Sequence, residues 1–322
     1  MVHETIDPRG TRSYRTGAAG REHLVPSDGT PAFYRERLNV ELNGKTIRDV
    51  FLYEPDTREV PLFSEMATVK MGGLWTTGNL YVGEASATAQ SGRRFVTFTT
   101  HRHLPLHVQL FDKRHRDSPY LRTAQNGREV VKATMRRTGV DKVRASGHSY
   151  AGMTLSQMAA FCGEYIESMV LQDPSGIGRH DLRLGELWHK ELKPASAHFR
   201  AAEHMPPDAM KNVVRHITDN PLLALREIVG LRAPDIRPQL QAAKDKGIKV
   251  GLLILGKSAI FNAQANKSIA EAEAMFHLIH EIPDAYHIDP NLRPGPVVEV
   301  QNRMFDELER LGTVEYYTAE GY

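Results

Sequence analysis

The segment from Val143 to Gly152 holds the residues whose types and order could do chemistry. It runs Val-Arg-Ala-Ser-Gly-His-Ser-Tyr-Ala-Gly, a strand-like stretch followed by a turn and a helical pattern. A serine hydroxyl is a weak nucleophile until a neighbouring base takes its proton. A sharp turn flanked by the small residues Gly147 and Ala151 would lift Ser149 above the end of a strand, where a histidine and a substrate could both approach it. The segment therefore predicts Ser149 as a nucleophile.

This segment resembles the nucleophile elbow of the α/β-hydrolase superfamily, in its serine-nucleophile branch, whose pattern is Gly-x-Ser-x-Gly. The chain departs from the pattern at one position, because Ala151 stands at the second glycine and Gly152 follows it. The resemblance extends over about residues 38–311 and is strongest at the elbow. It implies an α/β fold with a doubly wound, mostly parallel sheet and a helical cap insertion.

The resemblance also implies the order serine, acid, histidine along the chain. Residues 282–289, Ile-Pro-Asp-Ala-Tyr-His-Ile-Asp, resemble the family's histidine loop, since they follow the last predicted strand and precede the last predicted helix. His287 is therefore the expected general base, the alternative being a surface loop histidine. His277 and His280 fall within the preceding strand, which favours a structural role for both.

The position of the acid departs from the commonest family arrangement. That position follows the predicted strand 249–256, where Gly256–Asn262 contains no carboxylate. Some members of the superfamily place the acid one strand earlier, and there the chain has Asp173. We expect Asp173 to orient His287, the alternative being an aspartate that only caps a turn before a proline. Asp284 and Glu281 are weaker candidates for the acid.

An acyl-transfer site also needs backbone donors for the oxyanion that develops on the substrate. The amide of Tyr150 is expected to be one of them. By the resemblance, the second comes from the loop after the predicted strand 95–99, where the chain has Thr100-His101-Arg102 in place of the family's His-Gly. His101 is the candidate for this donor, and Arg102 remains an alternative.

The elements needed to position these residues alternate along the chain. Apolar and β-branched runs predict strands at 78–82, 95–99, 108–111, 143–146, 168–171, 249–256 and 276–279, and apolar periodicity predicts helices ending at Gly139, over 150–161, before Gly247 and over 297–311. Alternating strands and helices favour a parallel sheet. Residues 38–53, with an Asn43-Gly44 turn, predict a hairpin at one sheet edge.

Three regions are expected from the composition along the chain. Residues 1–35, rich in Gly, Arg, Thr and Pro, predict a poorly ordered N-terminal arm. Residues 36–176 and 248–322 form the expected core. Residues 177–247 form a helical cap insertion, in which an Asp219-Asn220-Pro221 helix start precedes an apolar stripe.

The bulk properties argue against several classes of partner. With 41 Lys and Arg against 39 Asp and Glu, the net charge is +2, too low to favour nucleic acid or an anionic membrane. The opening residues lack the apolar core of a signal peptide, so a cytoplasmic location is expected. His101, His103 and His107 lack an interleaved carboxylate, and Cys162 lacks a cysteine partner, so we expect no metal and no other cofactor.

Two functions from different classes follow. The first is a cofactor-free serine hydrolase that acts on a carboxylic ester, a small-molecule substrate, through a Ser149-Asp173-His287 triad and an acyl-enzyme. The second is a non-catalytic binding protein that keeps the fold while its site erodes. Three departures motivate it: Ala151 for glycine, no acid after the strand 249–256, and Thr100-His101-Arg102 in the oxyanion loop.

Overall fold

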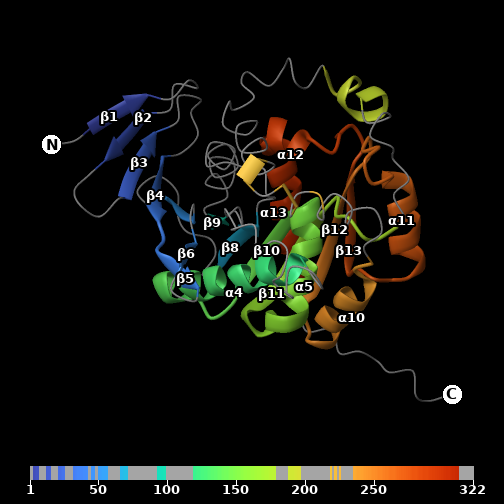
Figure 1. The fold of residues 1–322 in the computed structure, drawn as a ribbon, viewed down its shortest axis with the longest axis horizontal. Coiled ribbons are helices and arrows are strands. Elements are labelled where there is room, and N and C mark those ends of the chain that lie inside the picture. The colour runs from blue at the N-terminus through green and yellow to red at the C-terminus, as the bar shows by residue number, and fades with distance from the viewer. Residues whose placement is uncertain are drawn as a thin grey trace.

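One long β-sheet organises the part of the chain that the structure describes. A computed structural model describes residues 3–6, 12–15, 21–25, 32–42, 45–47, 50–56, 66–71, 93–98, 119–178, 188–196, 218–219, 221–222, 225 and 235–311. Within these ranges the sheet has 11 strands, which in spatial order are β1 (His3–Ile6), β2 (Arg12–Arg15), β3 (Arg21–Val25), β4 (Phe33–Arg37), β7 (Phe51–Pro55), β9 (Arg94–Phe98), β8 (Ala67–Met71), β10 (Val143–His148), β11 (Ile166–Gln172), β12 (Lys249–Leu255) and β13 (Leu278–Ile282) (Figure 1). β8 lies between β9 and β10, although it precedes both in the chain.

The half of the sheet that contains the elbow segment is parallel. β8 pairs in parallel with β9 and β10, and β11, β12 and β13 continue the parallel order. Gly147, near the end of β10, lies opposite Met71 of β8 and opposite Leu171 of β11. Because parallel strands end at the same edge, the segments that follow these strands start along one edge of the sheet.

Helices cover both faces of this parallel half, as the predicted α/β class requires (Figure 1). Successive residues of β11 point to opposite faces, so that Met169 and Leu171 join one apolar cluster and Val170 joins another. The helices that pack on the first cluster are α4 (Pro119–Thr138), α5 (Tyr150–Cys162), α10 (Arg237–Asp245) and α11 (Ala263–Ala272), whereas α13 (Pro294–Arg310) packs on the second. Burial on both faces explains the continuous apolar sequence of β12.

Most elements predicted around the elbow segment are confirmed, with shifted ends. The predicted strand 276–279 begins at Leu278 as β13, and the predicted helix 297–311 begins at Pro294 as α13. The predicted segments 78–82 and 108–111 lie outside the described residues. β8 was not predicted, because its Thr68 and Lys70 interrupt the apolar pattern, yet both side chains are buried.

The expectation of a poorly ordered arm over residues 1–35 is wrong for the residues described there. β1 to β4 form an antiparallel series that continues to β7 and β9. These strands cannot be recognised from the sequence because they have no long apolar run. Cross-strand pairs of charged and aromatic residues stabilise them instead. Glu22 accepts a hydrogen bond of 2.8 Å from Arg35 Nε, and the Arg21 guanidinium lies 4.2 Å from the centre of the Tyr34 ring.

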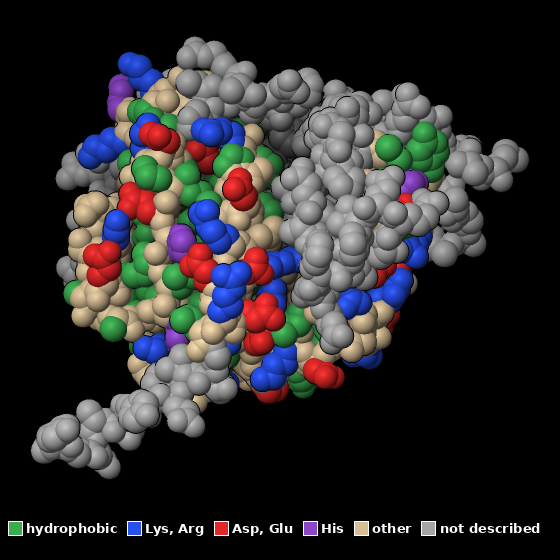
Figure 2. Space-filling view, turned by 180° about the vertical axis from the view of Figure 1, so that it is seen from behind, with side chains coloured by type: hydrophobic (Ala, Val, Ile, Leu, Met, Phe, Trp, Pro, Cys, Tyr) green, Lys and Arg blue, Asp and Glu red, His purple; other side chains and the backbone are tan. Residues whose placement is uncertain are grey.

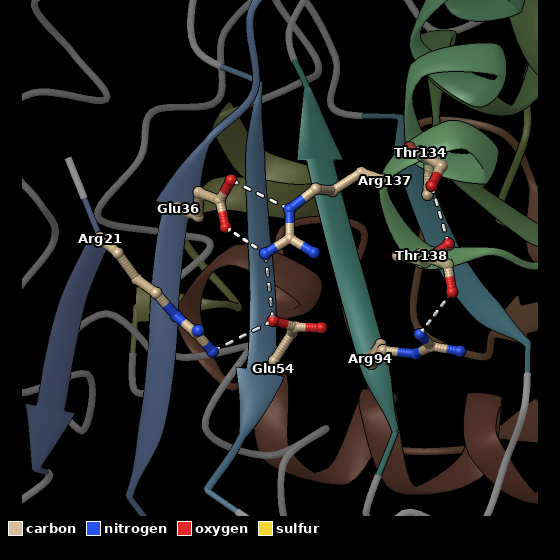
Figure 3. Close-up of polar contacts among 7 residues, drawn as sticks. All are labelled: Arg21, Glu36, Glu54, Arg94, Thr134, Arg137 and Thr138. Carbon is tan, nitrogen blue, oxygen red and sulfur yellow. Dashed lines mark hydrogen bonds and ion pairs between the residues drawn. The ribbon is translucent and has the colours of Figure 1, made fainter. Parts of the chain in front are cut away.

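The last turn of α4 is tied to these antiparallel strands by charged groups (Figure 3). Arg137 of α4 donates to both carboxylate oxygens of Glu36 on β4, over 3.1 and 2.6 Å. Glu54 of β7 lies 3.9 Å from the same guanidinium and 3.2 Å from that of Arg21 on β3. Arg94 of β9 donates to the Thr138 carbonyl over 2.9 Å. Three strands, β4, β7 and β9, therefore contact one helix end, and β3 is joined to them through Arg21 and Glu54.

The predicted hairpin over residues 38–53 is divided between two sheets. β5 (Val40–Leu42) and β6 (Lys45–Ile47) pair antiparallel around the Asn43-Gly44 position as a separate two-stranded sheet. β7, which was expected to be the second arm of the hairpin, instead lies between β4 and β9 in the main sheet. The antiparallel partner of β5 is therefore β6 rather than β7, and the predicted turn residues 43 and 44 lie outside the described residues.

The predicted cap, residues 177–247, is described only in part. Its last helix, α10, packs against α5 and β12, so this portion belongs to the core layer rather than to a cap. The described residues also include a short helical turn, η2 (Trp188–Leu192), and a few positions of the helix predicted after Asp219.

Charges of both signs are mixed on the described surface. In the view from behind, blue and red side chains alternate over the described part of the face (Figure 2). Among the described residues, no helix combines the length and the apolarity needed to cross a membrane. The same residues contain no cluster of His, Cys, Asp and Glu side chains suited to a metal ion.

Candidate active site

A strained turn places Ser149 between β10 and α5. β10 ends at His148 and α5 begins at Tyr150, so that Ser149 alone connects them with φ 58° and ψ −125°. A non-glycine residue with positive φ is rare, and such strain persists only where the surroundings impose it. Here the Ser149 amide donates to the Gln172 carbonyl over 3.0 Å, and its carbonyl accepts from the Gly152 amide over 3.0 Å.

Two glycines make room for this turn. A Cβ on Gly147 would lie 2.7 Å from the carbonyl oxygen of Ala151, which is backbone and cannot move aside cheaply. A Cβ on Gly152 would lie 2.9 Å from Cβ of Pro174 and 3.1 Å from the Gly147 carbonyl oxygen. The position after the serine at which the chain packs too closely for a Cβ is therefore Gly152. The methyl group of Ala151 is buried and does not disturb the turn.

The structure brings Ser149, His287 and Asp173 together. His287 Nε2 lies 2.9 Å from Ser149 Oγ, and His287 Nδ1 lies 2.5 Å from Asp173 Oδ2. An ionised carboxylate can only accept, so Nδ1 carries the hydrogen and Nε2 accepts from the serine hydroxyl. Asp173 is fully buried and His287 is 8% exposed, which shields both interactions from water.

The fold explains why Asp173, one strand away from Ser149, reaches the histidine. Asp173 directly follows β11, the parallel neighbour of β10, and its amide donates to the Leu253 carbonyl over 2.8 Å. Its φ of 39° turns the chain out of the strand direction at this point. His287 comes from the segment after β13, two strands further along the same edge.

The other acids and histidines weighed from the sequence lie in different interactions. His280 Nε2 lies 2.8 Å from a Glu307 carboxylate oxygen, and His277 Nδ1 accepts from the Val250 amide over 3.0 Å. Two further ion pairs join Glu281 to Lys267 over 2.6 Å and Asp284 to Lys257 over 2.7 Å. These contacts match the structural roles expected for the two strand histidines.

His148, the residue before Ser149, lies directly against His287. The two ring centroids are 4.6 Å apart and the rings are tilted by 40°. Burial lowers the pKa of His148 well below its usual value, and electrostatic interactions with His287 and Lys70 act in the same direction. His148 is therefore neutral near neutral pH and packs against His287 as an uncharged ring.

A buried glutamate that the sequence did not single out completes the surroundings of His287. Glu191, in η2, is fully buried, and its carboxylate accepts hydrogen bonds from the amides of His287 and Ala259 over 2.6 and 2.8 Å. Burial raises the pKa of Glu191 above its usual value. No sequence pattern around Trp188-His-Lys-Glu-Leu192 marks this residue, because its partners are backbone amides distant in the chain.

The two expected oxyanion donors differ in what the structure describes. Tyr150 is the first residue of α5 and directly follows Ser149, so its amide lies in the same turn as the serine. His101 lies outside the described residues, as does Arg102. The strand order bears on this choice, because β8, ending at Met71, separates β9 from β10, the strand that precedes Ser149.

Cys162 lies in the middle of the core, as expected, rather than near the site. Its side chain is buried at the end of α5, and burial raises the pKa of its thiol to about 12. The thiol therefore stays protonated and does not compete with Ser149 as a nucleophile.

Comparisons with known proteins agree on the fold alone. No protein-family model and no curated protein matches the sequence. Among solved structures, a bacterial membrane phospholipase A has a TM-score of 0.55 and 12% identity, covering 84% of this chain and 86% of its own. A thioesterase domain from the curacin biosynthetic pathway has a TM-score of 0.54 and 12% identity, covering 83% and 98%.

A bromoperoxidase from Bacillus anthracis has a TM-score of 0.52 and 12% identity, and the match covers 83% of this chain and 99% of that one. These proteins carry different activities on one scaffold, so the likeness identifies the architecture and leaves the chemistry to the site. The resemblance noted in the sequence is confirmed at this level: the chain has the α/β-hydrolase fold.

Proposed function

We propose that the protein is a serine hydrolase that cleaves a carboxylic ester through an acyl-enzyme on Ser149. The observation that carries this proposal is the continuous hydrogen-bonded chain from the buried Asp173 carboxylate through both nitrogens of His287 to the Ser149 hydroxyl. In this arrangement each group has one role, because the carboxylate fixes the tautomer and the imidazole takes the proton.

In the acylation step, Ser149 Oγ attacks the carbonyl carbon of the ester while His287 Nε2 takes the hydroxyl proton. A C–O bond forms, the carbonyl oxygen becomes an oxyanion, and the resulting imidazolium is stabilised by Asp173. The same proton then passes from Nε2 to the leaving alkoxide. The original ester C–O bond breaks, and an alcohol leaves behind an acyl group on Ser149.

In the deacylation step, His287 Nε2 takes a proton from water, and the hydroxide attacks the acyl carbon. Collapse of the second oxyanion breaks the bond to Ser149 Oγ, which recovers its proton from Nε2. The product of this step is a carboxylic acid, and the Ser149 hydroxyl is regenerated. Neither of these two reaction steps requires a metal or another cofactor.

For the oxyanion we propose the Tyr150 amide as one donor. The chain that leaves β8 at Met71, opposite Gly147, starts next to the nucleophile strand and continues in the sequence as Gly72-Gly73. Glycine lets backbone approach a ligand closely. We therefore favour this segment over His101 for the second donor.

The choice of an ester is supported by the chemistry of the site and by the names of two compared structures. Once Nε2 has taken the serine proton, the His287 imidazolium can protonate an alkoxide leaving group. A phospholipase A and a thioesterase domain are among the proteins that share the fold. The absence of a carboxylate at position 149 argues against the family's aspartate-nucleophile reactions.

The test is labelling of the purified protein with a fluorophosphonate, which reacts only with an activated serine. We expect labelling of the wild type, none for Ser149→Ala, and a rate about 10²- to 10⁴-fold lower for Asp173→Asn, since an amide favours the wrong imidazole tautomer. A folded wild type that does not label would favour the alternative, a binding protein without catalysis. Labelling without turnover on an ester panel would support Ser149 as the nucleophile and refute the ester as the substrate class.

A further inference from the structure

The segment after β12 contains no acid of its own, yet a carboxylate from elsewhere lies against it. Gly256–Asn262, where the commonest family arrangement has the acid, contains no Asp or Glu. In the structure Glu191, which precedes Ala259 by 68 residues, accepts a hydrogen bond from the Ala259 amide through Oε2 over 2.8 Å. Its Oε1 accepts the amide of His287 over 2.6 Å.

One carboxylate thus joins the segment after β12 to the segment after β13. Backbone bonds already connect the two segments, from the Gly256 amide to the Ile282 carbonyl and from the Lys257 amide to the Ala285 carbonyl, each over 2.9 Å. These bonds hold the start of the histidine segment. Glu191 adds a bond to the amide of His287 itself.

The contact falls at the point where a small displacement would matter most. His287 must keep Nε2 at 2.9 Å from Ser149 Oγ and Nδ1 at 2.5 Å from Asp173. Its ring also packs edge-on against Phe261, with centroids 4.8 Å apart at 82°, so the segment after β12 supports the ring while Glu191 supports the backbone. A loss of about 1 Å in alignment is enough to slow a catalytic step strongly.

The charge of Glu191 is part of its role. Each oxygen of an ionised carboxylate can accept an amide, whereas a protonated carboxyl or a carboxamide presents a hydrogen to one of the two amides. The groups that act electrostatically on Glu191 are His287, which favours its ionised form, and Asp173, which opposes it. A positive charge on His287 during turnover would therefore be stabilised by two buried carboxylates instead of one.

We propose that Glu191 is a positioning residue, whose ionised carboxylate holds the His287 backbone in register with Ser149 and links the insertion between β11 and β12 to the active site. The proposal rests on the proposed function. Its geometric basis is the pair of amide contacts made by a fully buried carboxylate.

The experiment compares fluorophosphonate labelling rates across pH for the wild type, Glu191→Gln and Glu307→Gln. Glu307 is a matched control, because its carboxylate also meets a histidine, His280, but outside the site. At alkaline pH we expect Glu191→Gln to label about 10- to 100-fold more slowly, the equivalent of one charge-assisted hydrogen bond, and Glu307→Gln to label like the wild type. The ratio of wild-type to Glu191→Gln rates should fall toward one as pH decreases and Glu191 takes up a proton.

A second measurement on the wild type covers the case in which Glu191→Gln does not fold. The amide proton resonances of His287 and Ala259 should shift upfield together as Glu191 is protonated, in the pH range where labelling slows. A wild type that does not label would refute the proposed function. A wild type that labels would overturn only the role of Glu191 if the variant matches its rate and pH profile, or if the two amide resonances do not respond.

Discussion

The imidazole of His148 lies against the imidazole of His287, with 4.6 Å between the ring centroids. Two imidazolium ions at this distance would repel each other strongly, and the structure avoids this by keeping one of them neutral. Burial is the largest cause of the lowered pKa of His148, followed by the charges of His287 and Lys70, while a hydrogen bond with the His287 backbone acts in the opposite direction. The serine is thus preceded by an uncharged ring.

Replacement of His148 by glutamine tests this neutrality. Because no charge is lost, we expect the pH midpoint of serine labelling to stay where it is in the wild type. If His148 were charged near neutral pH, its removal would relieve repulsion and raise the midpoint by roughly a unit or more. The measurement is the labelling rate from acid to alkaline pH, with Ser149→Ala as the blank.

The two small residues on either side of Ser149 should differ in whether they tolerate a methyl group: Gly147 should not, whereas Ala151 already carries one. Gly147→Ala places a Cβ 2.7 Å from the Ala151 carbonyl oxygen, so backbone must shift, at a cost of about 1 to 3 kcal/mol in the free energy of unfolding. The shift also displaces the serine, and labelling should drop.

Ala151→Gly is the matched control for this prediction, since it restores the family's Gly-x-Ser-x-Gly pattern. We expect it to label at the wild-type rate and to lose up to about 1 kcal/mol, the difference in helix propensity between the residues. Urea unfolding curves give both free energies. A Gly147→Ala variant as stable and as reactive as Ala151→Gly would contradict the steric account of the elbow.

How much of this site can be predicted from the sequence depends on how far apart in the chain the interacting residues are. The elbow could be predicted because strand, glycine, serine and helix are adjacent in the chain. Asp173 and His287 could be proposed only through the resemblance to a known fold, since 114 residues separate them. Glu191 could not be found at all, because its partners are backbone amides, which every residue type supplies.

The errors in the fold have a related cause. β8 was missed because Lys70 and Thr68 give it a polar alternation, and this hid the strand that lies next to β10. Without β8, the sequence alone points to the loop after β9 for the second oxyanion donor. The strands within residues 1–35 were missed because pairs such as Arg35 with Glu22 stabilise them across strands, and a pairing partner distant in the chain leaves no local pattern.

Two arginines that tie helices to the sheet should differ in their contribution to stability. Arg93 is 6% exposed, donates to the Asn302 backbone and side chain, and pairs with Asp306 of α13. Arg137 makes its pairs with Glu36 and Glu54 near the surface. We expect Arg93→Ala to lower the free energy of unfolding by about 1 to 3 kcal/mol and Arg137→Ala by about 0.2 to 1 kcal/mol.

Salt separates these two arginine contacts further. Added salt screens exposed pairs, so the effect of Arg137→Ala should shrink between low and high ionic strength, whereas that of Arg93→Ala should persist. Urea unfolding at two salt concentrations is the measurement. Equal effects for the two variants would mean that burial does not determine the strength of these contacts.

The stability and the reactivity conferred by Glu191 should change with pH in opposite directions. Burial raises the pKa of Glu191 in the folded state above its unfolded value of about 4.5, so the folded state binds the proton more tightly. The contribution of Glu191 to stability is therefore fully present below the unfolded pKa and is lost as pH rises through the folded pKa. The free energy of unfolding of the wild type minus that of Glu191→Gln should decrease over this range, while the ratio of their labelling rates (wild type to Glu191→Gln) increases.

Urea titrations and labelling at matched pH measure the two quantities. A residue with only a structural role would move both quantities in the same direction, and that result would count against a positioning role for Glu191.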